Sequence, residues 1–178
     1  MNYQAIDQSK QKEIAKLFTS VFSSSEGEEE GELIGNLSSE LAADIDHDEI
    51  ICFGAYEGKE LMASIFFTRL TVNYPIEIYM LAPVAVSTNK QRKGIGQELI
   101  SYGLNELKKH SVKVVVTYGD PSFYSKVGFQ QLSENVIQAP LKLSMPLGWQ
   151  GQSLTDEPIP IINERPLCVK AFNNPVYW

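Results

Sequence analysis

The sequence predicts an α/β protein built on a central sheet of mixed strand direction. Two segments with helical periodicity come first, a hairpin pattern follows, and a strand, loop, helix and strand then occupy residues 76–118. A hairpin joins antiparallel strands, whereas a crossover helix joins parallel ones. We therefore expect both strand directions in one sheet.

Two helices are expected within the first 45 residues. The apolar residues of the first helix recur at i, i+3, i+4 and i+7, as Ile14, Leu17, Phe18 and Val21. The second helix repeats this spacing with Leu33, Ile34, Leu37 and Leu41. Residues 23–32 between them are small, polar and acidic, so we predict a mobile loop that borders a substrate cleft.

Three strands should follow. Residues 50–56 and 61–72 read as a hairpin around a turn at 57–59, and a third strand covers residues 76–86. Pro83 lies inside this third strand, although proline cannot donate to a ladder. We predict a bulge or a local splaying of the strand at Pro83.

The rest of the chain gives the order ααβββαβα followed by strand candidates. Residues 95–107 have the spacing of an amphipathic helix, and residues 112–118 form a β-branched run typical of a buried strand. A short helix is expected at 122–126. Three further strands are candidates, at 129–131, 141–144 and 167–172.

Composition narrows the class of protein. With 178 residues and a net charge of −7, the chain is expected to form a single domain over residues 1–178. No apolar run reaches membrane-spanning length, and residues 1–7 resemble no leader, so we expect a cytoplasmic location with no membrane partner. The excess of acidic residues disfavours nucleic-acid binding. Cys52 and Cys168 have no CxxC or histidine cluster beside them, which favours buried free thiols and no metal site.

Residues 91–96 join the end of one strand to the start of a helix. The first N–H groups of a helix lack internal partners and carry partial positive charge, so they suit a phosphate. Gly94 and Gly96 allow close approach of the backbone, and Lys90, Arg92 and Lys93 add positive charge. The glycines alone leave open a solvated basic turn. Neither the P-loop spacing nor the GxGxxG dinucleotide spacing is present.

The same segment resembles the GNAT N-acetyltransferases. Gln91-Arg92-Lys93-Gly94-Ile95-Gly96 matches the family's Q/R-x-x-G-x-G/A signature, and it follows a strand of the family's Leu-x-Pro-Val-Ala-Val type. A second segment, residues 119–129, is similar to the family's later motif, in which a tyrosine lies four residues before a Gly-Phe pair. The resemblance spans roughly the whole chain.

The resemblance implies a fold and a site. The fold is a GNAT-like mixed, mostly antiparallel central sheet with a splayed strand pair, flanked by helices. Acetyl-CoA would place its pantetheine arm along the backbone of Ala85 and Val86. Its pyrophosphate would bind the backbone of Gln91, Arg92, Lys93, Gly94, Ile95 and Gly96. Asp120 stands where many relatives carry an asparagine that contacts the cofactor.

The resemblance also implies a reaction. A neutral primary amine of a small molecule or peptide attacks the thioester directly, Tyr124 protonates the leaving thiolate, and Glu77 is a candidate base, with a surface charge as the equal alternative. A core aromatic is the alternative reading of Tyr124.

The rival function is a noncatalytic acyl-CoA-binding regulatory module. Trp178 has two possible roles, capping the core or docking a partner chain in a homodimer.

Overall fold

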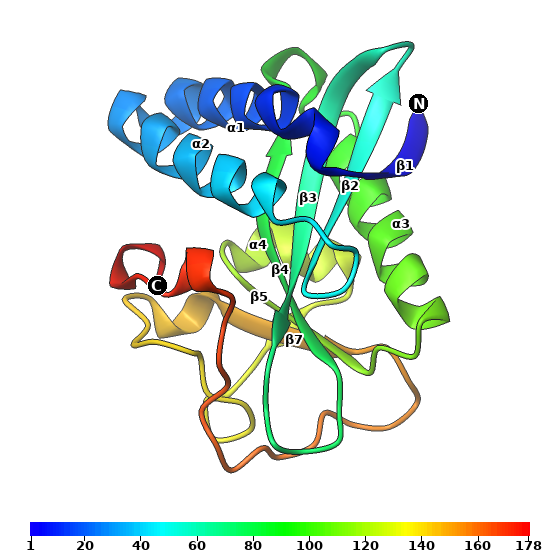
Figure 1. The fold of residues 1–178 in the computed structure, drawn as a ribbon. Coiled ribbons are helices and arrows are strands. Elements are labelled where there is room, and N and C mark those ends of the chain that lie inside the picture. The colour runs from blue at the N-terminus through cyan, green and yellow to red at the C-terminus, as the bar shows by residue number, and fades with distance from the viewer. The chain divides into compact units, whose positions relative to one another are not determined.

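A computed structural model describes residues 1–178 and contains one seven-stranded sheet in the order β1-β2-β3-β4-β5-β7-β6 (Figure 1). The strands are β1 (Asn2–Ile6), β2 (Ile50–Glu57), β3 (Glu60–Leu70), β4 (Ile78–Val86), β5 (Val114–Tyr118), β6 (Gln130–Gln131) and β7 (Trp149–Ser153). The pairs β1–β2, β5–β7 and β6–β7 are antiparallel, whereas β4–β5 is parallel. The prediction of a mixed, mostly antiparallel sheet is confirmed.

The chain divides into two compact units, which are described separately. The first combines Met1–Phe67 with Pro83–Gly103, and the second combines Thr68–Ala82 with Leu104–Trp178. Strands β3 and β4 and helix α3 (Ile95–Lys109) each contribute residues to both units. No helix is both long and apolar enough to cross a membrane.

Helices α1 (Gln11–Glu26) and α2 (Glu28–Ala43) lie side by side in the first unit (Figure 1). Ile14, Phe18 and Val21 are buried on α1, as the periodicity predicts. The two backbones approach closely because α2 carries glycine at its contacts with α1. A Cβ added to Gly31 would lie 2.8 Å from the Cα of Ser23.

The prediction of a mobile loop at residues 23–32 is wrong. Residues 23–26 end α1 and residues 28–32 begin α2, so Gly27 alone breaks the helical run, at φ 99°. The acidic residues belong to a helix, although their composition favours a loop. Three glutamates occupy the first turn of α2, where the helix dipole favours negative charge.

Strand β1 was not predicted from the sequence. It pairs with β2 from Asn2 opposite Tyr56 to Ile6 opposite Cys52. Tyr3 stacks on Tyr102 of α3, with ring centroids 5.8 Å apart, and its hydroxyl donates to Glu98. These contacts attach β1 to the helix that follows the candidate phosphate loop.

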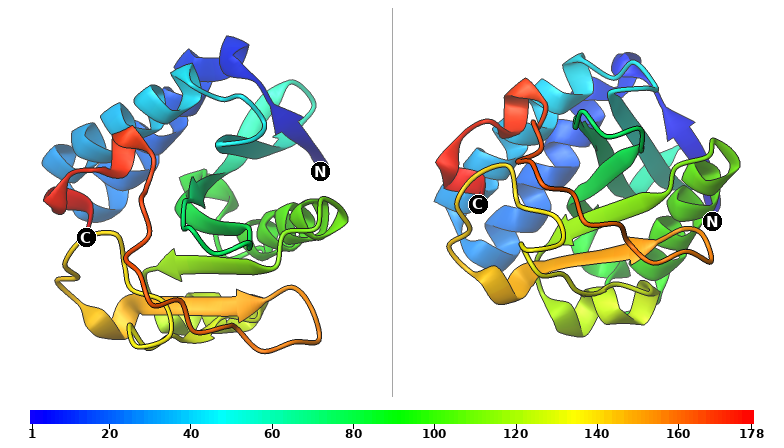
Figure 2. Two further views of the ribbon diagram at one scale, coloured as in Figure 1. Left: turned by 60° about the horizontal axis from the view of Figure 1, so that its bottom comes forward. Right: turned by 90° about the horizontal axis from the view of Figure 1, so that it is seen from below.

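Strand β5 is central to the second unit. It pairs with β4 on one side and with β7 on the other, and Figure 2 shows β5 and β7 side by side. The predicted strand at 129–131 is present as the short β6, but the strands expected at 141–144 and 167–172 are not formed. Leu167 makes only an isolated bridge with Thr71, and Lys170–Phe172 is a 3₁₀ turn.

The two cysteines are free, as predicted. Cys52 is buried in β2, where its thiol contacts the Ser64 hydroxyl at 3.3 Å. Cys168 is only half-buried and lies outside any strand, so the prediction that it is a buried strand residue is wrong. The two apolar neighbours that suggested a strand belong to a segment that forms a bridge instead of a ladder.

Trp178 packs into the core of the second unit. Only 5% of its surface is exposed, and its indole N–H donates to the Phe172 carbonyl at 2.8 Å. Its ring stacks on Tyr118 and lies against Trp149, with centroids 6.3 and 6.2 Å away. The structure thus supports the capping role for Trp178.

Candidate functional site

Strand β4 loses its β5 partner partway along its length. The parallel ladder runs from Ile78 opposite Val114 to Leu81 opposite Thr117, and β4 then continues to Val86. Pro83 follows two residues after the last pair and has no N–H to donate. The backbone of Ala85 and Val86 therefore has no β5 partner, as the prediction of splaying at Pro83 requires.

The start of the following loop is fixed to the strands of the first unit. The amide of Ser87 donates to the Met62 carbonyl of β3 at 2.7 Å. The Lys90 ammonium pairs with Glu57 at the end of β2, at 2.6 Å, and the Gln91 side chain donates to the Val86 carbonyl at 3.1 Å. The loop is therefore anchored before α3 begins.

The amides of residues 91–96 are available to a ligand. None of them donates to a backbone carbonyl, and the first helical bond of α3 runs from Glu98 to the Gly94 carbonyl at 3.0 Å. Arg92 and Gly94 have φ of 60° and 82°. Alternation of left-handed and ordinary residues gathers successive N–H groups into a concave anion site.

Two cations extend from this loop. Arg92 and Lys93 are exposed, whereas Lys90 is engaged with Glu57. A Cβ on Gly94 would meet no atom within 4 Å, so the backbone conformation, more than crowding by the protein, requires glycine there. Ile95 and Gly96 are buried at the start of α3.

Tyr124 ends the short helix α4 (Pro121–Tyr124) in the second unit. Asp120 caps this helix, because its carboxylate accepts from the Ser122 amide at 2.9 Å and from the Ser122 hydroxyl at 2.8 Å. These two bonds hold the pKa of Asp120 below its usual value. This aspartate is therefore committed to a helix cap.

The Tyr124 ring is enclosed by aromatic neighbours and by a glycine. Phe123 and Phe129 meet it edge-on, with centroids 5.0 and 5.8 Å away. A Cβ on Gly119 would lie 2.8 Å from the ring. Burial raises the pKa of Tyr124 to about 12, the Thr117 hydroxyl acts to lower it, and the Asp120 carboxylate adds to the rise. The phenol is therefore protonated at neutral pH.

Glu77 immediately precedes β4 in the second unit. Its side chain is 47% exposed and pairs with Arg69 at 3.4 Å, while the Arg69 guanidinium lies 5.0 Å from the centre of the Tyr79 ring. The Glu77 carbonyl accepts from the Lys113 amide, so Glu77 lies at the level of Lys113. Thr117 is four residues further along β5, about 13 Å away at the rise of a strand.

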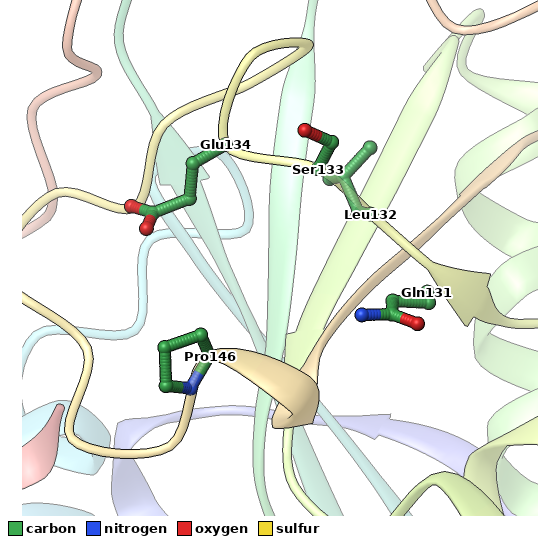
Figure 3. A pocket seen from close by; sticks show the side chains of 5 residues that line it. All are labelled: Gln131, Leu132, Ser133, Glu134 and Pro146. Atoms are coloured by element: carbon green, nitrogen blue, oxygen red, sulfur yellow. The ribbon is translucent and has the colours of Figure 1, made fainter.

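A separate pocket of about 400 Å³ opens in the second unit (Figure 3). It is lined by Gln131, Leu132, Ser133, Glu134 and Pro146. The Glu134 carboxylate accepts from the Ala139 amide at 3.3 Å. No residue predicted for the site from the sequence lines this pocket.

The predicted site residues fall into two groups. Ala85, Val86 and residues 91–96 belong to the first unit, whereas Tyr124 and Glu77 belong to the second. Sequence reasoning did not single out Gly119, which leaves room for the Tyr124 ring, or Thr117, whose hydroxyl acts to lower the pKa of Tyr124. The only available signal was the position of Thr117 inside the β-branched strand and of Gly119 just after it.

Comparisons with known proteins agree on one family. A family model described as an acetyltransferase (GNAT) domain matches residues 2–132. An uncharacterized N-acetyltransferase of Escherichia coli strain K12, YjhQ, is 30% identical over 110 residues, which cover 58% of this chain. The match spans 60% of the length of that relative.

Solved structures share the fold. The GNAT family N-acetyltransferase YhbS from Escherichia coli, in complex with CoA, has a TM-score of 0.79 at 20% identity and covers 97% of this chain and 92% of its own. A GNAT family acetyltransferase from Brucella melitensis, in complex with acetyl-CoA, has a TM-score of 0.68 at 21% identity and covers 97% of each chain.

Proposed function

Because this chain belongs to the GNAT family of acetyltransferases, we propose that it transfers the acetyl group of acetyl-CoA to a primary amine of a small molecule or peptide. One observation carries the proposal. Strand β4 leaves its partner β5 after Leu81 and leads into a loop whose amides at residues 91–96 make no backbone bond. Acetyl-CoA as cosubstrate also fits the family, since two structures with this fold were solved with CoA or acetyl-CoA.

The unpaired end of β4 and the loop suit different parts of the cosubstrate. The pantetheine arm carries amide groups, which can pair with the open backbone of Ala85 and Val86 in the manner of an added strand. The pyrophosphate is an anion, and the amides of residues 91–96 together with the dipole of α3 would stabilise it. Arg92 and Lys93 add charge at the rim of the loop.

Tyr124 would supply the proton that the leaving thiolate requires. Attack by the amine nitrogen forms a C–N bond and breaks the C–S bond, and the sulfur takes the phenolic proton. Since the pKa of Tyr124 is about 12, the proton is present on the phenol at any physiological pH. An alkyl amine with a pKa near 10.4 is neutral in only about one molecule in a few thousand at pH 7, so a base also helps.

Glu77 remains the candidate base, in competition with its ion pair to Arg69. A Glu77→Gln variant distinguishes the two roles by its pH profile. Loss of a base lowers turnover most at neutral pH and least at alkaline pH, where the amine is already neutral. A uniform change at every pH indicates that Glu77 serves only the Arg69 pair.

Calorimetric titration with acetyl-CoA, with ATP and NAD as controls, tests the proposal. We expect saturable binding of acetyl-CoA alone, followed by CoA release when a panel of primary amines is added. No binding by the folded protein would overturn the assignment. Tight binding without CoA release for any amine would favour the noncatalytic acyl-CoA-binding module.

A further inference from the structure

We propose that Gln150 and Gln152 of β7 are positioning residues for Tyr124, because their side chains hold the two ends of the segment that carries it. The inference rests on the proposed function of Tyr124. It assigns a role to two amide side chains that belong to no motif recognised in the sequence.

The topology carries the Tyr124 segment across β7. Strands β5 and β6 lie on either side of β7 and are both antiparallel to it, so they run parallel to each other. Residues 119–129, the α4 segment, must therefore cross one face of β7 (Figure 2). Gln150 and Gln152 are two residues apart in β7, so their side chains share a face of the sheet. Both donate to carbonyls of the α4 segment, so this face is the one that the segment covers.

Gln150 fixes the start of the α4 segment. Only 1% of Gln150 is exposed, and its side-chain nitrogen donates to the Gly119 carbonyl at 3.1 Å and to the Gly148 carbonyl at 3.2 Å. These two bonds use both N–H groups of the side chain. The Gly119 amide also donates to the Gly148 carbonyl, at 3.0 Å. The N–H and the C=O of Gly119 are therefore both held in place.

Gln152 fixes the end of the α4 segment. Its side-chain nitrogen donates to the Val127 carbonyl at 3.0 Å. Gly128 follows with φ 93°, and a Cβ there would lie 3.1 Å from the Gln152 side-chain oxygen, so glycine leaves room for the amide. No backbone N–H donates to the carbonyl of Gly119 or of Val127. The two glutamines therefore supply hydrogen bonds that the backbone does not.

Tyr124 lies between these two fixed points. A Cβ at Gly119 would lie 2.8 Å from the Tyr124 ring, so the ring packs directly against the Gly119 backbone. The Tyr124 amide donates to the Asp120 carbonyl, and the Tyr124 carbonyl accepts from the Phe129 amide, both at 3.2 Å. A shift at either end of the α4 segment therefore moves the phenol.

Methionine variants remove the donors and preserve the length of the side chains. Gln150→Met leaves the Gly119 carbonyl without its donor, and Gln152→Met does the same for the Val127 carbonyl. Gln130→Met is the matched control, because Gln130 is an exposed residue of β6 whose side chain makes no hydrogen bond. If Gln150→Met does not fold, Gln152→Met, at a half-buried residue, provides the same test.

The kinetic measurement is kcat per acetyl-CoA-binding site, with the sites counted by calorimetry. We expect each of the two variants to lower kcat about ten-fold, since a displacement of about 1 Å in a reacting group can cost about 10²-fold. KM for acetyl-CoA should not change. In a Tyr124→Phe background the same substitutions should have little further effect. An equal loss in that background would overturn the positioning role, because the glutamines would then act independently of the phenol.

A ¹⁹F spectrum tests the position of the ring without turnover. All eight tyrosines are replaced by 3-fluorotyrosine, and the Tyr124 signal is identified by its loss in Tyr124→Phe. We expect this signal to shift in Gln150→Met and Gln152→Met and to stay in place in Gln130→Met. An unchanged signal in the first two would overturn the inference, whatever the turnover. Wild-type protein that is inactive with every amine defeats the proposed function, while a shifted signal still supports the hold of the glutamines on the ring.

Discussion

The phenol of Tyr124 combines two properties that a proton donor to a thiolate requires. It keeps its proton at neutral pH, and its ring is held by Phe123 and Phe129. Tyr124→Phe removes the proton and preserves the ring, so we expect kcat to fall by about 10²-fold or more, with the Kd for acetyl-CoA unchanged. Steady-state kinetics and calorimetry check this, with Tyr74→Phe, at a 49% exposed tyrosine, as control. Normal turnover in Tyr124→Phe would remove it from the mechanism.

Gly119 affects the position of the Tyr124 ring because it has no side chain. A Cβ at this residue would lie 2.8 Å from the Tyr124 ring, so Gly119→Ala should displace the phenol and lower kcat without unfolding the protein. The check is a double-mutant cycle with Tyr124→Phe. If Gly119 acts through the phenol, the alanine has little further effect on turnover once the phenol is gone. Additive effects would contradict this mechanism.

The helical pair α1–α2 depends on close backbone approach. In the exposed interior of a helix, replacing glycine with alanine stabilises the helix by up to about 1 kcal/mol. At Gly31, however, the added Cβ would lie 2.7 Å from the Ser23 amide nitrogen, and overpacking of this kind costs about 1–3 kcal/mol. Gly31→Ala should therefore lower the free energy of unfolding in urea, whereas Asn36→Ala, on the exposed side of α2, should not. A more stable Gly31→Ala protein would show that the helices can separate at little cost.

In the loop between β4 and α3, the effect of backbone strain on stability can be measured separately from an effect on acetyl-CoA binding. Gly94 and Gly58 both have positive φ and open space around the missing Cβ, so Gly94→Val and Gly58→Val should destabilise the fold by similar amounts, about 1–3 kcal/mol. Only Gly94 lies among the amides proposed to bind pyrophosphate. We expect calorimetry to show weaker acetyl-CoA binding for Gly94→Val alone. Equal affinities in the two variants would place the anion elsewhere.

Elements whose apolar residues recur at a regular spacing were predictable from the sequence, and elements formed by long-range pairing were not. Helices α1 and α3 and strands β2 to β4 follow from the spacing of their apolar residues. Strand β7 is Trp-Gln-Gly-Gln-Ser, which carries no strand pattern and is stabilised by β5 and β6 on either side. Conversely, the apolar residues near Leu167 suggested a strand, although the structure provides them with a single bridge partner.

The candidate site was predictable in part for the same reason. The loop at residues 91–96 and Tyr124 could be proposed from the sequence, because the motifs that contain them are local. The end of the ladder at Leu81 and the hydrogen bond from Thr117 to Leu81 depend on how distant segments meet. No local pattern contains that information.

Across the whole molecule, ionisable groups limit stability at both ends of the pH scale. Burial raises the pKa of Tyr3, Tyr56 and Tyr124 from 10.0 to about 12. Their contribution to the free energy of unfolding is fully present below pH 10. It is lost as the pH rises from 10 to 12, because the unfolded chain ionises more easily than the folded protein. The pKa values of Asp7 and Asp120 are lowered by hydrogen bonds from serines, so their contribution is lost as the pH falls below 3.8.

Urea unfolding at pH 3, 7 and 11.5 measures this dependence. We expect the midpoint urea concentration to be highest at pH 7 and lower at both extremes. Tyr124→Phe should reduce the difference between pH 7 and pH 11.5, because one of the groups that resists ionisation is absent. An identical alkaline decline in the variant would mean that Tyr124 ionises equally easily in the folded and unfolded chains.

The chain passes from one compact unit to the other after Phe67, Ala82 and Gly103. Neither unit is a continuous stretch of sequence, so no single cut separates the two units from each other. Joining two genes after residue 103 would exchange the tyrosine proposed to protonate the sulfur without the residues proposed to bind the acetyl donor, but it would divide the second unit between the two parents. A chimera with a crossover at residue 82 would divide both units between its two parents.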